Sequence, residues 1–422
     1  MDKKSKKILY TVMFTVFVDM LGVGILIPVL PLLVSVGSPY SILPAGWTIK
    51  QGVILLGWLS AIYPLFQFIA TPILGQLSDK YGRKKVLAGS LVGTALGYML
   101  FAFGILTKNL PLMFFARALD GITGGNISAA QAAVADISKP EERAKNFGMV
   151  GMMFGIGFVA GPYIGGKLAL ASAPISIFGK HIMDTPSWFG TSTPFWFAAI
   201  LSGLNILFVL GYLAETNLKL NKAKLNFTKA LENIKNAFKY EGIKSIAPSM
   251  LLFTGGFTFF TTFFGLILNQ KFGFNQSNIG DYFAYIGICI AIAQGLIVPR
   301  VAAKFKDYKI INVAYFGTSI AILLYALATK SSQLYFIAPI LAIFNGLTMA
   351  NTNAFISRTS PKEIQGEALG ISASVQALGQ AVPAIIAGYV GSLSQNLPIF
   401  VSAGLMLLAT SVFAGMYRKK RA

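Results

Sequence analysis

Residues 75–85 read GQLSDKYGRKK, a short charged stretch with a long apolar segment on either side. The flanking segments, 51–77 and 86–107, each reach the roughly 20 apolar residues that a helix needs to cross a bilayer. Lipid cannot satisfy backbone hydrogen bonds, and both segments are too long for barrel strands. The stretch 75–85 is therefore predicted to be a tight loop between two membrane-spanning helices.

The whole chain repeats this alternation of apolar segments and short charged loops. Hydrophobic residues make up 55% of its 422 residues and charged residues only 12%, against roughly 25% charged residues in soluble domains. This apolar content excludes disorder. We expect an all-α polytopic membrane protein with twelve transmembrane helices, at 8–36, 51–77, 86–107, 110–135, 143–171, 194–214, 246–270, 279–299, 310–329, 333–356, 364–391 and 397–417.

The cationic residues are distributed unevenly among the loops. There are 35 Lys and Arg against 15 Asp and Glu, a net charge of +20. Of the 35, 28 lie at the two termini, in the central loop and in alternate loops, and the opposite loops hold Lys50, Lys108, Lys167, Lys180, Lys271 and Lys330. The positive-inside rule then predicts that both termini and the central loop are cytoplasmic, with anionic lipids against that face. We expect the membrane to be a bacterial inner membrane. The charge thus indicates orientation, and we expect no nucleic-acid partner.

A polar stretch at 215–245 divides the predicted spans into six and six, so we expect two six-helix bundles, at 1–214 and 246–422, joined by a cytoplasmic linker. The two bundles share sequence features: 67–72 and 294–299 both run from Gln to Pro, and 138–148 resembles 360–370. Such pairs predict pseudo-symmetric halves with a binding site between them. The linker is expected to form an amphipathic helix on the membrane surface or a regulatory contact, its apolar face made by Phe227, Leu231, Ile234 and Phe238.

Residues typical of catalytic or metal centres are scarce. Cys289 is the one cysteine and His181 the one histidine, and no nucleophile–base or metal-ligand constellation is apparent. We therefore expect no enzyme activity, no metal site and no cofactor. Asp281 is expected to lie near the outer mouth of span eight, in solvent.

The stretch 75–85 also resembles the GxLaDrxGrkxxl loop of the major facilitator superfamily. Gly75 allows close helix approach and Gly82 allows a tight turn. The resemblance implies the major facilitator fold. It further implies that Asp79 contacts the start of span eleven and that Arg83 reaches Asp136, so that both contacts close a cytoplasmic gate. The alternative is a simple anchor loop with a helix cap.

Span five contains GFVAGPYIGG at 157–166, which is similar to the gxxxGPxxGG motif of the antiporter branch of that superfamily. Small residues at four-residue spacing let helices pack closely in lipid, and a proline inside a helix favours a kink. The motif favours antiport, and its alternative interpretation is a packing seam only. It comprises Gly157, Gly161, Pro162, Gly165 and Gly166.

Three charged residues are predicted within the membrane. Asp19 lies in VFVDMLGVGILIPVLPLL, which resembles the first helix of tetracycline-efflux proteins, and Arg117 with Asp120 lies in an RxxxGxxgg-like stretch of span four. Ionisable residues at this depth are costly and mark functional sites. All three are candidates for proton coupling. The alternative is that Arg117 and Asp120 form a fixed ion pair and that Asp19 has a structural role. Polar candidates for a substrate cavity are Gln67, Asn126, Gln131, Asn269, Gln294, Asn345, Asn351, Asn353, Gln376 and Gln380.

These features together predict a monomeric secondary transporter that exports a small hydrophobic or amphiphilic compound, such as a drug, in exchange for protons by rocking of its two halves. The proton gradient would be its energy source. The alternatives are a proton symporter that imports a sugar or organic acid, and a membrane sensor or scaffold without transport. The resemblance to tetracycline efflux weakens in span three, where Gly97 stands at a position that is acidic in those proteins.

Overall fold

A computed structural model describes residues 3–172, 174–177, 180–217, 225–240, 243–360, 365–394 and 396–419. Helices dominate these residues. They are α1 (Lys3–Leu33), α2 (Ile49–Tyr81), α3 (Arg83–Leu106), α4 (Leu110–Thr123), η1 (Gly124–Asn126), α5 (Ile127–Ile137), α6 (Pro140–Leu168), α7 (Thr193–Tyr212), α8 (Lys229–Ala237), α9 (Ala247–Phe272), α10 (Gln276–Ile292), η2 (Ala293–Ile297), α11 (Val298–Lys304), α12 (Asp307–Leu327), α13 (Ser331–Thr359), α14 (Gln365–Leu393) and α15 (Leu397–Lys419).

Eleven helices among the described residues are long and apolar enough to cross a membrane. They coincide with eleven of the twelve predicted spans. The remaining one, predicted at 110–135, is interrupted by the 3₁₀ turn η1, which leaves α4 with 14 residues and α5 with 11. Neither piece alone covers the bilayer core at 1.5 Å per residue. The count of twelve spans therefore stays a prediction.

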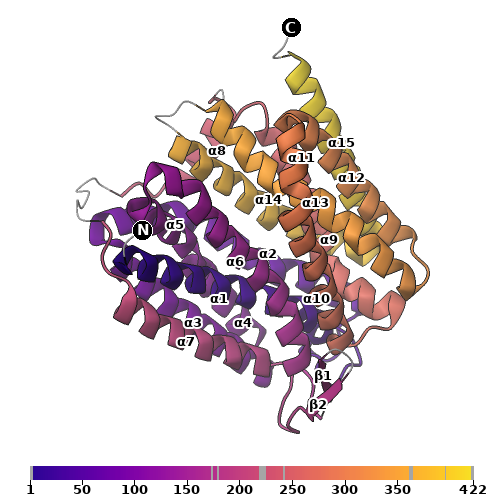
Figure 1. The fold of residues 1–422 in the computed structure, drawn as a ribbon. Coiled ribbons are helices and arrows are strands. Elements are labelled where there is room, and N and C mark those ends of the chain that lie inside the picture. Colours follow the sequence, from indigo (N-terminus) through magenta and orange to yellow (C-terminus); the bar gives the residue numbers. More distant parts are fainter. Residues whose placement is uncertain are drawn as a thin grey trace. The chain divides into compact units, whose positions relative to one another are not determined.

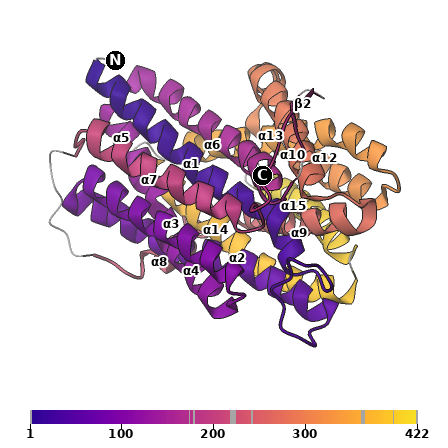
Figure 2. The same ribbon diagram turned by 90° about the horizontal axis from the view of Figure 1, so that it is seen from below.

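The described residues pack into two compact units. Unit 1 comprises Met1–Trp47, Phe66–Lys229 and Phe274–Ala284. Within it α1 packs against α6 and α7, and α3 packs against α4 and α7. Figures 1 and 2 show α1 lying between α6 and α7 from two directions. The charged candidates of the first spans lie in this unit.

Unit 2 comprises Thr48–Leu65, Ala230–Gly273 and Tyr285–Ala422. Its helix α9 packs against α14 and α15, and α12 packs against α13 and α15. Aromatic rings fill its core, and their largest fully buried members are Phe263, Phe264, Tyr315, Tyr325 and Phe413. Two long helices divide between the units, α2 after Leu65 and α10 after Ala284.

The two glutamines that the predicted repeat makes equivalent lie in different units. Gln67 of α2 donates a hydrogen bond to the carbonyl oxygen of Gly124 at 3.0 Å. Gln294 of η2 lies beside Gly346 of α13, where a Cβ atom would stand 3.6 Å from the glutamine Cγ. The equivalent glutamines thus both pack at a glycine, one in span four and the other in span ten.

Two features outside the long helices modify the predicted picture. A hairpin of β1 (Pro174–Ile177) and β2 (Lys180–Asp184) follows α6. The prediction of an all-α chain is therefore wrong for this segment. The linker does contain a helix, α8, but Phe227 and Phe238 of the predicted apolar face lie outside it, and its buried residues are Ala230, Asn233 and Ala237. Asn233 of α8 donates to Ser374 Oγ of α14 at 3.0 Å, while Leu231 stays exposed. One face of α8 is therefore docked on unit 2.

Candidate functional site

Asp19 lies in the middle of α1 and is 4% exposed. Neither of its carboxylate oxygens makes a hydrogen bond of standard geometry with the described residues. The side chain of Asn126 and the carboxylate of Asp120 are its polar neighbours. A buried carboxylate that lacks a cationic partner is unfavourable in its charged form. The charge of Asp19 therefore depends on what binds beside it.

Arg117 and Asp120 form the ion pair that their spacing predicts. Arg117 Nη1 donates to Asp120 Oδ2 at 3.0 Å, and both side chains are almost fully buried. Gly97 of α3 lies directly against this pair, because a Cβ atom there would stand 3.1 Å from Asp120 Cβ. Asp19, Asn126, Arg117 and Asp120 thus form one buried polar cluster within unit 1, which is called the acid cluster below.

The break in span four supplies part of this cluster. The turn η1 carries Gly124, Gly125 and Asn126, all buried. Gly125 is required by close packing, since a Cβ atom would stand 2.8 Å from the backbone nitrogen of Thr71. Two glycines together lower the helix preference of this stretch. The chain departs from the α-helix at the residues where Asn126 approaches Asp19.

The glycines of the span-five motif form a backbone-close seam. A Cβ atom on Gly157 would stand 2.5 Å from the carbonyl oxygen of Phe17, and one on Gly165 would stand 3.0 Å from Ile25 Cα. Gly161 faces Gly24 of α1 in the same way. Three of the motif glycines therefore pack α6 onto α1, the helix that carries Asp19.

The loop at 75–85 forms a compact charge cluster. Arg83 contacts Asp136 at 3.2 Å, the contact that the resemblance implies, and pairs with Asp79 at 2.5 Å. Its Nη1 also donates to Ser78 Oγ at 2.6 Å. Gly82 has a φ of 99°, which confirms the need for glycine in this turn. Asp79 was expected to contact the start of span eleven, where residue 364 and the side chains of 365–367 lie outside the described residues.

Glu215 completes this cluster and was missed in the sequence. Its Oε1 accepts from the backbone N–H of Arg83 at 2.9 Å, and its Oε2 accepts from that of Lys84 at 3.2 Å. It therefore caps the start of α3, where unpaired backbone N–H groups favour an anion. The available sequence signal was an acid directly after span six, opposite a basic loop.

The remaining polar candidates are divided between the two units, and each is described by its local contacts. Asn351 donates to the carbonyl oxygen of Leu347 on its own helix at 2.7 Å, and Gln376 donates to Ser372 Oγ at 3.4 Å. Gln131, Gln294 and Gln380 are exposed. Asn269 and Asn345 are half-buried, and the side chain of Asn353 lies outside the described residues. Of the set, Asn126 belongs to the acid cluster, and Gln67 of α2 contacts the same η1 turn through Gly124.

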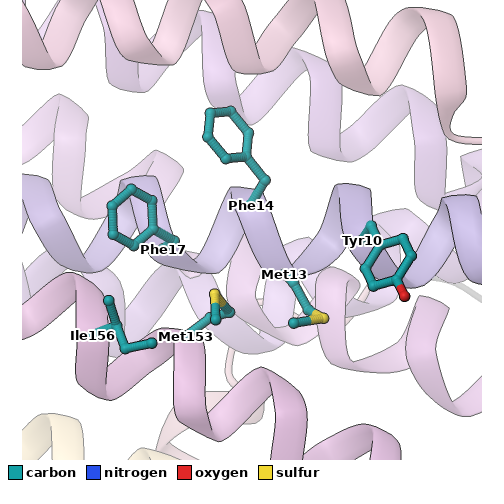
Figure 3. Close-up of a pocket in the computed structure, with 6 residues that line it drawn as sticks. All are labelled: Tyr10, Met13, Phe14, Phe17, Met153 and Ile156. Carbon is teal, nitrogen blue, oxygen red and sulfur yellow. The ribbon is translucent and has the colours of Figure 1, made fainter.

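An apolar groove of about 340 Å³ runs along the first half of α1. Figure 3 shows that α1 and α6 supply the side chains at its surface, which are Tyr10, Met13, Phe14, Phe17, Met153 and Ile156. Apart from the Tyr10 hydroxyl these groups are hydrocarbon or thioether. The groove can accept an apolar chain, but it offers few groups that would orient a polar ligand.

Lys167 departs from its predicted surroundings and pairs with Asp281, which is exposed as expected. Lys167, expected in an outer loop, is 7% exposed at the end of α6. Its Nζ lies 2.9 Å from Asp281 of α10 and donates to Ser277 Oγ at 2.7 Å. Asp281, expected simply in solvent, is therefore paired. Among the described residues, no group of three or more His, Cys, Asp or Glu side chains could hold a metal ion.

A match to a family model shows which protein family the chain belongs to. The model described as Major Facilitator Superfamily matches residues 12–382 and 249–422. The chain belongs to the Major Facilitator Superfamily. Its many apolar helices agree with this multi-pass membrane transporter family, and the resemblance seen in residues 75–85 is thereby confirmed.

Curated relatives and solved structures show similarity over nearly the whole chain. The class C tetracycline resistance protein of Escherichia coli is 29% identical over 391 residues, covering 89% of this chain and 87% of that protein. The quinolone resistance protein NorA of Staphylococcus aureus is 25% identical and covers 95% and 94%. A D-xylose–proton symporter structure superposes with a TM-score of 0.77 at 13% identity, covering 97% of both chains. The last likeness concerns the fold alone.

Proposed function

We propose that this major facilitator is a proton-coupled antiporter that exports a small hydrophobic or amphiphilic compound, such as a drug. The observation that carries the proposal is the acid cluster. Asp19 is buried and has no cationic partner among the residues that the structure describes, while Asp120 in the same unit is already paired with Arg117. A proton and a cationic or polar group of the substrate can compete for such a carboxylate, which is the requirement of an exchanger.

The sequence relatives support the direction of transport. Proteins named for tetracycline, quinolone and multidrug resistance match 89 to 99% of this chain. The span-five motif packs α6 onto the helix that carries Asp19, so a change at the acid can be transmitted to the seam. The substrate binds as a small molecule, protons are the second partner, and no further cofactor or enzymatic step is needed.

The proposed topology has twelve spans in two six-helix bundles with both termini cytoplasmic, in a bacterial inner membrane. Eleven of these spans are long continuous helices, and the fourth in chain order is α4, η1 and α5 taken together. The Arg83 cluster then lies at the cytoplasmic surface and acts as the gate latch. Leu231 of α8 is exposed, as are Phe227 and Phe238 on either side of this helix. These side chains lie on anionic lipid, and the protein works as a monomer.

Substrate screening tests this proposal. Cells that express the chain are loaded in turn with fluorescent dyes, quinolones, tetracyclines and quaternary amines, and accumulation is compared with cells that express Asp19→Asn. Lower accumulation of at least one compound with the native chain, abolished by a protonophore, is the expected result. Equal accumulation for every compound, or energy-dependent uptake instead of loss, would contradict export.

A further inference from the structure

The Lys167 side chain is held at the end of α6 by three contacts from two helices. Its Nζ pairs with Asp281 at 2.9 Å and donates to Ser277 Oγ of α10 at 2.7 Å. The Tyr163 ring of its own helix lies 5.6 Å from the ammonium. The lysine side chain is 8% exposed and the aspartate side chain 46%. The pair therefore joins α6 to α10 at a border between protein and solvent.

A close backbone contact lies directly beside this ion pair. A Cβ atom on Gly280 would stand 2.8 Å from the carbonyl oxygen of Pro162, and one on Gly166 would stand 3.2 Å from Gly280 Cα. Such close approach requires glycine at positions 166 and 280. The two helices thus touch along their backbones at the point that the ion pair fixes, and small movements of either helix would change the pair.

The division of α10 gives this contact its importance. By the sequence repeat, α10 belongs to the second set of six spans. The segment Phe274–Ala284, which holds the first residues of α10, nevertheless lies in unit 1 and contacts α6, while the helix from Tyr285 onward lies in unit 2. In an alternating-access cycle the ends of spans five and eight must separate on the side away from the termini. That separation has to break the Lys167 contacts.

We infer that Lys167 and Asp281 are positioning residues of the transport cycle: their ion pair, with Ser277, latches α6 to α10 at the end distant from the cytoplasmic gate cluster. Only the effect of this latch on transport rests on the proposed function. Its effect on the α6–α10 contact can be measured without any substrate.

A buried cysteine reports whether the contact is open. Cys289 is the one native cysteine, so Cys289→Ser with Gln276→Cys leaves one thiol at a position that is 4% exposed, with its backbone carbonyl against Gly166. Alkylation of whole cells with a membrane-impermeant maleimide then measures separation of the two helices. Ser331→Cys, at an exposed position, serves as the accessible reference.

The latch predicts which variants increase this labelling. Lys167→Met and Asp281→Asn should each raise the Gln276→Cys labelling rate by about fivefold, as for loss of a half-buried ion pair. The exchange Lys167→Asp with Asp281→Lys should restore slow labelling. Lys271→Met is the matched control, because Lys271 instead donates to the carbonyl oxygen of Ala326, and it should leave the rate unchanged.

Two results would overturn the latch. One is native-like labelling in both single variants while Ser331→Cys labels normally. The other is fast labelling in the charge exchange, which would mean that the residues act by shape and not by charge. In transport, the single variants should lower the maximal efflux rate with little change in KM, and the exchange should recover it. If no compound is exported by the native chain, the proposed function fails, and the labelling result still decides the latch.

Discussion

The acid cluster contains one paired and one unpaired carboxylate. Asp120 is neutralised by Arg117 at 3.0 Å, while Asp19 has Asn126 and Asp120 as polar neighbours. The unpaired acid is therefore the group whose charge a substrate or proton can change, and the pair acts as its fixed electrostatic surroundings. This division of roles distinguishes the two acids that the sequence left equivalent.

Substitutions in the Arg117–Asp120 pair test the structural half of this division. Arg117→Met or Asp120→Asn alone should lower stability by about 3–5 kcal/mol, because each leaves the other group without its partner in a buried position. The double variant should recover most of that loss. Thermal unfolding of the purified proteins in detergent measures the effect, and strictly additive losses would contradict a coupled pair.

At the scale of elements, the seam between α1 and α6 depends on glycines that face backbone atoms. A Cβ atom on Gly161 would stand 2.7 Å from Gly24 Cα, whereas Gly155 of the same helix has no atom within 4 Å of such a position. The motif is therefore a packing device first. Its link to antiport lies in the helix against which it packs, since that helix carries Asp19.

Alanine substitutions along α6 separate packing from helix propensity. Gly161→Ala should destabilise the protein by about 1–3 kcal/mol through overpacking, and it should slow efflux. Gly155→Ala is the matched control and should be neutral or stabilising by up to about 1 kcal/mol, because alanine favours the helix. Equal behaviour of the two variants in thermal unfolding would show that the seam can relax.

The spans could be predicted because long apolar runs between charged loops have one stable form in lipid. Contacts within one helix or one short loop were also accessible, as for Arg117 with Asp120. The helix break at Gly124–Asn126 could not be predicted, because this sequence is also compatible with a continuous helix. Its close packing against Thr71 is known only from the structure. Lys167 was assigned to a loop, since its partners Ser277 and Asp281 are more than a hundred residues away and depend on the register of α6 against α10.

At the scale of the whole molecule, the number of spans decides where the termini lie. Twelve spans place both on one side, and eleven would place them on opposite sides. Fluorescent-protein fusions at each terminus and an alkaline phosphatase fusion in the loop before α7 distinguish these cases. Fluorescence at both termini and phosphatase activity in the loop are expected. Fluorescence at one terminus only would exclude α4, η1 and α5 as a continuous span.

Proton exchange through Asp19 is the central claim for the whole molecule. Purified protein in liposomes, with a compound identified by the cellular screen, allows an imposed pH gradient to be the only energy source. We predict accumulation of the compound in the acidic compartment, coupled to proton exit, and loss of this accumulation by at least about tenfold in Asp19→Asn, with Asp19→Glu retaining part of it. Gradient-driven accumulation that is unchanged in Asp19→Asn, or movement of compound and protons in the same direction, would contradict the account.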